Sequence, residues 1–274
     1  MTSIDTTNAI AMSATATTPV LFISHGAPTF ATAPSRLGPL LRTLGTQLPD
    51  IKAVLVVSPH WQTQGVTVMR TVRPETVHDF GGFPPDLYAL QYPVDGAPAL
   101  ANAAAALLNA AGLAVGFDDR RGLDHGAWVP LRHLLPAGQV PVFQVSMPVN
   151  LTTATAVKLG RALAPLRAQG VLIVASGSMT HNLYDFRPSG GQPEAYAEAF
   201  TAWVQTAVRA RALQPLIHYR AQAPHAARAH PSEEHFLPLL VALGATTELD
   251  AVRVLPGGID HAALSMESYV WGMH

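Results

Sequence analysis

The amino-acid sequence predicts a single-domain α/β fold, in which a central sheet, mostly parallel or mixed, is flanked by helices. Apolar runs rich in β-branched residues occur at 20–23, 54–57 and 171–175. Such runs are typical of strands that are buried on both faces of a parallel sheet. Each run leads into a serine and then a histidine. A site is therefore expected at the carboxyl ends of the strands, where open sheets of this class bind ligands.

From residue 35 to residue 128, the pattern predicts two helices, one further strand and two loops. Residues 35–48 carry leucines at helical spacing, and 98–111 are rich in alanine, so both are expected to be helices. Residues 66–69 are expected to form a strand. Residues 76–93 are rich in Gly, Pro and aromatics without a clear period, which predicts a long ordered loop over the active edge. Residues 118–128 are expected to form a second loop.

The second half of the chain is expected to alternate strands with helices and to close the sheet. A buried strand over 140–146 precedes a helix over 152–169, which ends at Gly170. A helix over 231–243 begins with Ser232, an N-cap candidate that is followed by glutamates in the first turn. The remaining expected elements are a helix over 194–213 and strands over 252–255 and 265–271.

The composition is that of a well-buried globular protein. Apolar residues make up 49% of the 274 positions and charged residues 13%, unlike the composition of disordered chains. No repeat or linker divides the sequence, so one domain is expected over residues 19–274. Residues 1–18 are rich in Thr, Ala and Ser and lack the features of a signal peptide. They are interpreted as a disordered tail on a cytoplasmic protein.

Charge and cysteine content exclude several classes of function. The formal net charge is -1 without a basic block, which argues against binding to nucleic acid or to an anionic membrane. No apolar stretch reaches the roughly 18 residues needed to span a bilayer. The chain has no cysteine, so disulfides, thiol nucleophiles and Cys-zinc sites are excluded. Any metal must be held by nitrogen and oxygen.

Three of the twelve histidines follow the predicted strands. His25 precedes Gly26, which allows a sharp turn and close approach of the backbone to a ligand. His60 follows the second strand, and His181 can reach the same edge from a flexible turn after the third. Because parallel neighbours lie about 4.8 Å apart, histidines at adjacent or next-adjacent strand ends can bind one ion at about 2.1 Å each. The alternative is that these three histidines follow strands by chance and bind no metal.

Other histidines have weaker local contexts. His125 lies beside Asp124 on the expected loop, and that carboxylate is a candidate to orient the imidazole. His235 follows Glu234 at a helix start, where consecutive side chains diverge by about 100°, so only one of the two is expected to face a metal. His78, in the aromatic loop, is a candidate substrate contact. The remaining histidines are expected to be surface or structural residues: His133, His218, His225, His230, His261 and His274.

Six short motifs follow one another along the chain. They are Ser24-His25-Gly26, Ser58-Pro59-His60-Trp61, the segment from His78 to Pro84, Asp124-His125-Gly126, the segment from Ser176 to Leu183, and the segment from Glu234 to Leu239. Together they resemble the DOPA-dioxygenase branch of the class III extradiol ring-cleavage dioxygenases. This superfamily also includes the catalytic subunit of protocatechuate 4,5-dioxygenase. The resemblance extends from about residue 19 to 271, nearly the whole chain.

The resemblance implies an extradiol-dioxygenase-like catalytic domain over residues 19–274 with one mononuclear metal ion, Fe(2+) or Zn(2+). It implies His25 and His60 as ligands and His235 as the third ligand. In the protocatechuate branch the third ligand is a glutamate, as in the two-His-one-carboxylate sites of ferrous oxygenases. Glu234 therefore stays open as the alternative to His235.

The resemblance also implies the catalytic groups and the reaction. His181 corresponds to an active-site histidine that is either a base or a fourth metal ligand, and His125 to a second acid/base. The implied reaction inserts both atoms of O2 next to the paired hydroxyls of a catechol, DOPA or a related compound. A neutral histidine suits removal of the hydroxyl proton. His78, Phe80 and Phe83 are the expected substrate contacts, although the two phenylalanines alternatively anchor their loop to the core.

Two other classes of function stay open from the residues alone. One is a zinc hydrolase in which His181 or Glu234 acts as the base for a metal-bound water. The H-E-x-x-H signature of metalloproteases is absent from the sequence, which counts against it. The other is a non-catalytic binding protein built on the same fold.

Overall fold

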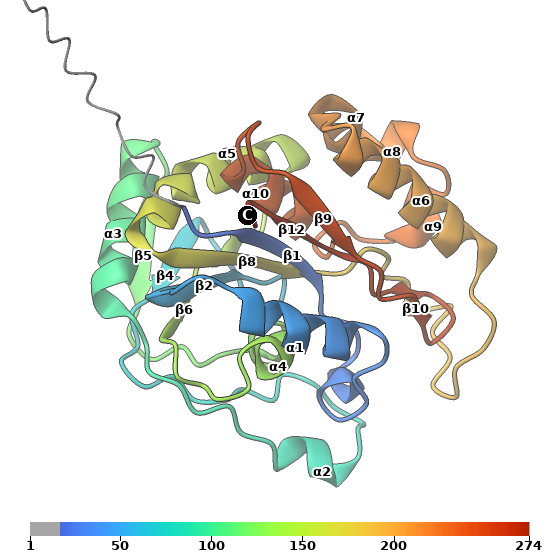
Figure 1. Cartoon of the computed structure of the whole chain (residues 1–274), viewed down its shortest axis with the longest axis horizontal. Coiled ribbons are helices and arrows are strands. Elements are labelled where there is room, and N and C mark those ends of the chain that lie inside the picture. The colour runs from blue at the N-terminus through green and yellow to red at the C-terminus, as the bar shows by residue number, and fades with distance from the viewer. Residues whose placement is uncertain (1–16, 274) are drawn as a thin grey trace, which may run out of the picture.

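The central sheet of the computed structural model, which describes residues 17–273, has the strand order β6-β2-β8-β1-β12-β9 (Figure 1). Strands β6, β2, β8 and β1 are parallel, and β12 is antiparallel to both of its neighbours. The sheet is therefore mixed, and the predicted α/β class is confirmed. The strands are β1 (Val20–Ser24), β2 (Ala53–Val57), β6 (Val142–Gln144), β8 (Val171–Gly177), β9 (Val252–Leu255) and β12 (Ser268–Trp271).

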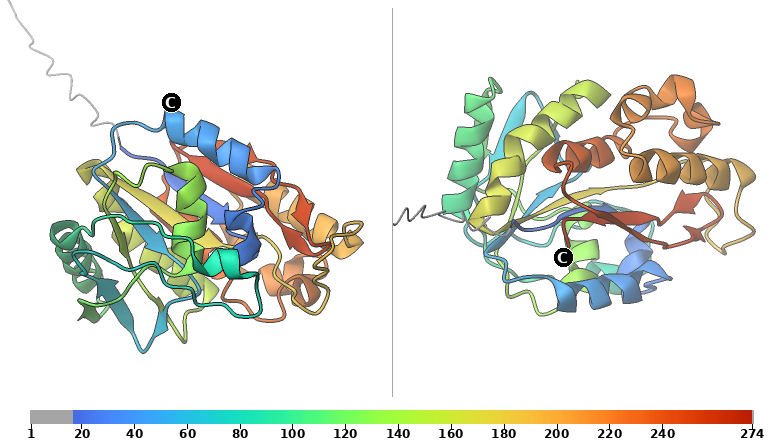
Figure 2. Two further views of the ribbon diagram at one scale, coloured as in Figure 1. Left: turned by 90° about the horizontal axis from the view of Figure 1, so that it is seen from below. Right: turned by 45° about the horizontal axis from the view of Figure 1, so that its top comes forward.

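Helices cover both faces of this sheet (Figure 2). All residues of β1, β2 and β8 are buried, which explains their continuous apolar sequences. Helix α10 packs against both α5 and β8, whereas α4 packs against α1. One face carries α1 (Leu37–Gln47) and α4 (His125–Leu134), and the other carries α3 (Pro98–Ala110), α5 (Thr153–Leu163) and α10 (Leu237–Ala245).

Smaller elements surround this three-layer core. Beside α10, on the same side of the sheet, lie α6 (Ala195–Arg209), α7 (Leu213–Ile217), α8 (Tyr219–Gln222) and α9 (Ala226–Ala229) (Figures 1 and 2). Three short strand pairs are β3 (Gln62–Thr63) with β7 (Met147–Pro148), β4 (Val66–Met69) with β5 (Val115–Asp118), and β10 (Ile259–Asp260) with β11 (Leu264–Ser265). The remaining helical segments are α2 (Pro85–Tyr88), η1 (Pro28–Ala31) and η2 (Ala164–Gln169). Across residues 17–273, no helix is both long and apolar enough to cross a bilayer.

Several predicted boundaries are wrong for identifiable reasons. The helix predicted over 152–169 changes to a 3-10 helix at residue 164, because Pro165 lacks the N–H that a continuing α-helix needs. The helix predicted to begin near Ser232 begins at Leu237 instead. The hydroxyl of Ser232 donates to a Glu234 carboxylate oxygen and caps no helix.

The predicted loop over 118–128 is the largest error in secondary structure, because α4 begins inside it at His125. Asp124 is the N-cap of α4, and its side chain accepts the N–H of Ala127. Pro130 lies inside the helix and has no N–H to donate to the carbonyl of Gly126. That carbonyl accepts a hydrogen bond from Ser176 of β8 instead, so α4 is joined to the sheet directly below the site.

The folded part of the chain begins before residue 19. Thr18 is buried, and its carbonyl accepts a hydrogen bond of 2.7 Å from Nε of Arg167. The same guanidinium forms a buried bidentate ion pair with Asp250, with both N–O distances at 2.7 Å. Residues 1–16, most of the predicted tail, lie outside the described residues.

Candidate metal centre and active site

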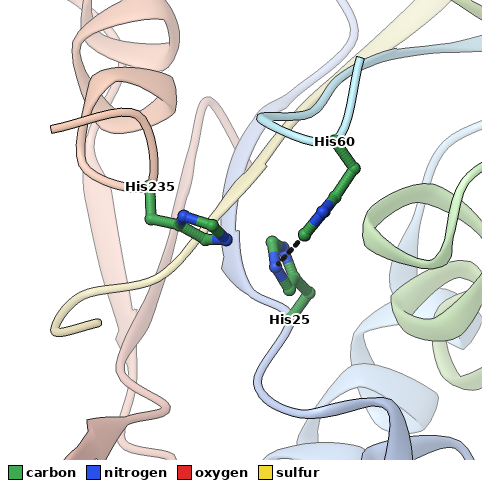
Figure 3. Close-up of side chains that lie close together, drawn as sticks. All are labelled: His25, His60 and His235. Atoms are coloured by element: carbon green, nitrogen blue, oxygen red, sulfur yellow. Dashed lines mark hydrogen bonds between the residues drawn. The ribbon is translucent and has the colours of Figure 1, made fainter. Parts of the chain in front are cut away.

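His25 and His60 meet at the carboxyl edge of the sheet. They follow β1 and β2, which flank β8 on either side. The N–H of His25 donates to the carbonyl of Gly177 at the end of β8, which holds the turn after β1 against its neighbour. The Nε2 atoms of His25 and His60 lie 3.1 Å apart (Figure 3). The placement expected from the strand endings is therefore observed.

His235 reaches the same point from the segment that precedes α10. Its carbonyl accepts the N–H of Ser178, at 2.9 Å, just after β8. Its Nδ1 lies 3.0 Å from Oε1 of Glu234, while its Nε2 is buried without a protein partner. One ring nitrogen from each of His25, His60 and His235 lies within 4.8 Å of the others (Figure 3), whereas Glu234 belongs to a second such group, with His181 and His235.

Hydrogen bonds on the far side of two rings assign their protons to Nδ1. Ser176 donates to the Gly126 carbonyl, so its oxygen accepts from Nδ1 of His25 at 2.9 Å. Nδ1 of His235 donates to Glu234. In each ring the Nε2 lone pair is then directed into the site, the arrangement that metal-binding histidines usually show.

The donor set fits a metal ion. Burial is the main cause that holds the pKa values of His25 and His235 well below the ordinary value, and the neighbouring imidazoles lower them further. Burial is also the main cause that lowers the pKa of His60 to about 4. Neutral imidazoles are the form that binds metals. Two Nε2 atoms 3.1 Å apart have the spacing of two nitrogens bound to one ion at about 2.1 Å each.

Two further imidazoles flank this group. The ring centroid of His125, at the start of α4, lies 3.9 Å from that of His60. The His181 ring stacks on His235 with centroids 3.5 Å apart and planes 6° from parallel. Burial lowers the pKa of His181 to about 4. The five histidines expected as metal ligands or proton-handling groups are thus brought together.

Asp79, not Asp124, orients His125. Its two carboxylate oxygens accept from the backbone N–H of His125 at 2.8 Å and from Nδ1 at 3.0 Å. Its Oδ2 also lies 3.5 Å from Nδ1 of His60. Burial alone raises the carboxyl pKa of Asp79, but the hydrogen bonds and charge of His125 outweigh it and lower the pKa to about 2. A single carboxylate therefore supports two of the five rings.

Asp124 has a different role from the predicted one. Its carboxylate accepts from Ser58 at 2.8 Å and from Gln144 at 2.9 Å, and it pairs with Arg121 at 3.2 Å. The Ser58 hydroxyl also accepts the N–H of His60 at 3.2 Å. Asp124 therefore supports the turn that carries His60 rather than the His125 ring.

A cavity of about 350 Å³ opens over the imidazoles. Phe80 and Phe83 line it and also pack against the core, so the anchoring alternative is observed and the substrate-contact role stays a prediction. His78 does not line the cavity: its Nε2 lies 2.9 Å from the carbonyl of Leu90. The structure adds five apolar lining residues that the sequence analysis did not assign to the site: Ala27, Pro28, Leu183, Phe186 and Leu264.

The sequence contained a signal for Leu183 and Phe186, because both follow closely after His181, a predicted site residue. Leu264 had none, because it comes from β11, far along the sequence. Among the histidines expected to be structural, His133 and His230 are buried and pair with carbonyls of Phe30 and Met179. His274 lies outside the described residues.

Comparisons with known proteins agree with this geometry. Residues 24–263 match the family described as the catalytic LigB subunit of aromatic ring-opening dioxygenase. A 4,5-DOPA dioxygenase extradiol from Beta vulgaris is 40% identical over 260 residues, covering 90% of this chain and 94% of that protein. One from Escherichia coli (strain K12) is 36% identical, covering 91% and 93%.

A solved structure shares the fold. It is an uncharacterized protein from Escherichia coli K12, with a TM-score of 0.77 and 31% identity, and the match covers 92% of this chain and 99% of that one. The resemblance seen in the six motifs is therefore confirmed, and the hydrolase alternative is not favoured. The chain belongs to the class III extradiol ring-cleavage dioxygenases, in the DOPA-dioxygenase branch, and is a metal-dependent ring-opening enzyme.

Proposed function

We propose that this dioxygenase opens a single-ring catechol with O2, and that its cofactor is one ferrous ion held by His25, His60 and His235. The observation that carries the ligand assignment is the buried Nε2 of His235, which has no protein partner and faces two other imidazoles. A metal ion held by these three residues would supply that partner. When bound, Fe(II) supplies redox chemistry between catechol and O2, which Zn(II) does not have.

The names of the relatives support the choice of substrate class. The proteins from Beta vulgaris and Escherichia coli are both called 4,5-DOPA dioxygenases. The cavity volume of about 350 Å³ lies near the lower limit for small-molecule sites, which favours one ring over a fused system. Phe80 lies edge-on to His125 with centroids 5.7 Å apart, so an aromatic wall stands beside the imidazoles where a substrate ring would stack.

His125 is assigned to proton handling because of its fixed orientation. Asp79 accepts from its Nδ1, which leaves Nε2 as an acceptor on the cavity side of the ring. An imidazole in this tautomer can take the proton of a catechol hydroxyl and later return it. Asp79 then stabilises the imidazolium that forms, as a charge-assisted hydrogen bond does.

His181 is proposed as the second proton-handling group, with a ligand role as the alternative. Its ring lines the cavity and stacks on His235. One of its ring nitrogens lies within 4.8 Å of a Glu234 carboxylate oxygen and of a His235 ring nitrogen, and the ring borders the cavity, where it can meet substrate. If His181 is a base, His181→Phe should retain the metal and lose turnover by on the order of 10²–10⁴-fold. Release of the metal would assign it as a fourth ligand.

The test of the reaction is spectrophotometric. Iron-reconstituted protein in air should consume O2 with a panel of catechols and produce a yellow semialdehyde with a new near-visible absorption band. The zinc-loaded protein is the control and should consume none, since zinc is redox-inactive. No uptake with any catechol, together with ester or amide hydrolysis by the zinc form, would overturn the proposal.

The ligands are tested by metal content. His25→Ala and His60→Ala should each lose the metal as well as activity, because each removes one of three donors. His133→Ala is the matched control, since His133 is a buried histidine paired with a backbone carbonyl outside the site. If elemental analysis still finds stoichiometric metal in both ligand variants, the assignment is wrong.

A further inference from the structure

Ser176 of β8 lies between the metal ligand His25 and the first turn of α4. Its side chain is fully buried. Its Oγ lies 2.9 Å from Nδ1 of His25 and within hydrogen-bond distance of the carbonyl of Gly126. A serine hydroxyl has one proton, so it can donate to only one of these two neighbours at a time. The direction of that proton therefore decides whether Nδ1 of His25 donates to Ser176 or accepts from it.

The carbonyl of Gly126 is free to accept the hydroxyl proton because of Pro130. In a regular α-helix this carbonyl would accept the N–H of residue 130, but proline has none. The ring of a proline inside a helix also pushes away the carbonyl four residues before it. A carbonyl only accepts, whereas a neutral imidazole nitrogen either donates or accepts. The hydroxyl proton therefore goes to the carbonyl, and Oγ of Ser176 accepts from Nδ1 of His25.

The first turn of α4 packs this close to the site because residue 126 has no side chain. A Cβ on Gly126 would lie 2.4 Å from Oγ of Ser58 and 2.9 Å from Cδ2 of His60. The same turn carries Asp124, which accepts from Ser58, and His125, which borders the cavity. One helical turn thus contacts the supports of two ligands and supplies a third ring of the site.

We propose that Ser176 is a positioning residue for His25, and that Pro130 sets the direction of its hydroxyl group. Pro130 does so by leaving the carbonyl of Gly126 free to accept the proton. With Nδ1 of His25 held as a donor, its Nε2 lone pair is directed to the neighbouring imidazole of His60, 3.1 Å away, and is available to a metal ion. This inference rests on the proposed function in that it concerns a ligand of the same site.

The first test determines the tautomer of His25 in the metal-free protein. Long-range 1H–15N spectra distinguish a ring protonated at Nδ1 from one protonated at Nε2, and the His25 signals are assigned by their loss in His25→Ala. The wild-type ring should be protonated at Nδ1. Ser176→Ala removes the acceptor of that proton, so the ring should shift toward protonation at Nε2, where the Nε2 of His60 offers another partner.

Ser146→Ala is the matched control. Ser146 is also fully buried, but its hydroxyl accepts the N–H of Thr67 at 2.8 Å and lies 2.6 Å from the hydroxyl of Thr63, outside the site. This variant should keep the wild-type tautomer of His25. A wild-type ring protonated at Nε2, or the same tautomer in the wild type and Ser176→Ala, would overturn the proposal.

The second test measures metal affinity by calorimetric titration of the metal-free protein with Zn(II). Removal of a group that orients a metal-binding histidine usually weakens metal binding by about 10–100-fold. The Kd for Zn(II) should rise by about this factor in Ser176→Ala and should equal the wild-type value in Ser146→Ala. Thermal unfolding of the metal-free variants verifies that both are folded. An unchanged Kd in Ser176→Ala, or an equal rise in both variants, would overturn the proposal.

A double-mutant cycle tests the role of Pro130. Pro130→Ala restores an N–H at residue 130, which draws the Gly126 carbonyl into the helix and frees the Ser176 hydroxyl to donate to Nδ1 of His25. The Kd for Zn(II) should therefore rise in Pro130→Ala. It should not rise further when Pro130→Ala is added to Ser176→Ala, because both changes act through one contact. Unchanged affinity in Pro130→Ala, or additive effects of the two changes, would refute the role of the proline.

These measurements separate failure of this inference from failure of the proposed function, because none of them depends on turnover. If the iron-loaded protein opens no catechol, the proposed function fails, and the tautomer of His25 still decides the role of Ser176. If the enzyme opens catechols and the tautomer is the same in the wild type and Ser176→Ala, the proposed function stands and this inference fails.

Discussion

Replacing Asp79 by asparagine should impair catalysis without unfolding the protein. Asp79 accepts from the backbone N–H and Nδ1 of His125, at 2.8 and 3.0 Å, and its Oδ2 lies 3.5 Å from Nδ1 of His60. The side chain is 21% exposed, so these contacts are only partly screened by water. Asparagine keeps one oxygen for the backbone N–H, but its NH2 group cannot accept from an imidazole nitrogen.

The size of the effect follows from the lost contact. Hydrogen bonds that involve a charged group contribute about 1.5–3 kcal/mol, and each 1.36 kcal/mol changes a rate about tenfold. The loss of one such bond to His125 predicts a fall of about 10- to 100-fold in kcat/KM. This agrees with the usual cost of removing a carboxylate that orients an active-site or metal-binding histidine, which is also about 10–100-fold.

The assay combines steady-state kinetics, metal analysis and thermal unfolding of the iron-loaded protein. Because Asp79 acts on the proton-handling ring, kcat should fall more than KM changes. Asp119→Asn is the matched control, since Asp119 is an exposed carboxylate paired with Arg70, and its kinetics should match the wild type. Unchanged kcat/KM in Asp79→Asn would refute the positioning role. If the fall in kcat/KM is explained entirely by loss of the metal, Asp79 acts by positioning His60 rather than His125.

Three further predictions concern the third ligand and stability. His235→Ala should release the metal in elemental analysis while Glu234→Ala retains it, and the reverse result would make Glu234 the ligand. Arg167→Met should cost about 3–5 kcal/mol in urea unfolding, because it leaves the buried carboxylate of Asp250 unpaired; a cost below about 1 kcal/mol would contradict this. Burial acts to raise the pKa of Asp250, but hydrogen bonds from Arg167 and the backbone outweigh it and lower the pKa from 3.8 to about 2. Since the folded-state pKa is the lower one, about 2 kcal/mol of stability is present above pH 3.8 and is lost as the pH falls through about 2. Asp250→Asn should lack this acid dependence, and an identical dependence in both proteins would refute the assignment.

The sequence by itself determined the central strands and the edge at which the site lies. Runs such as 54–57 are apolar at every position because both faces of the strand are buried, and that pattern is local. The placement of His25 and His60 followed directly, because parallel strands direct their carboxyl ends to one edge. The six motifs supplied the rest of the histidine set through the family resemblance.

Only the tertiary structure decided how the remaining groups serve these rings. Asp79 and His125 are 46 residues apart, and no periodicity relates a loop carboxylate to a distant helix start. Gly126 and Pro130 favour a loop locally, yet α4 forms because Asp124 caps it and Ser176 satisfies the carbonyl that proline leaves free. Local patterns report which faces of an element are buried, whereas partners distant in sequence are selected by packing and by the need of buried polar groups for hydrogen bonds.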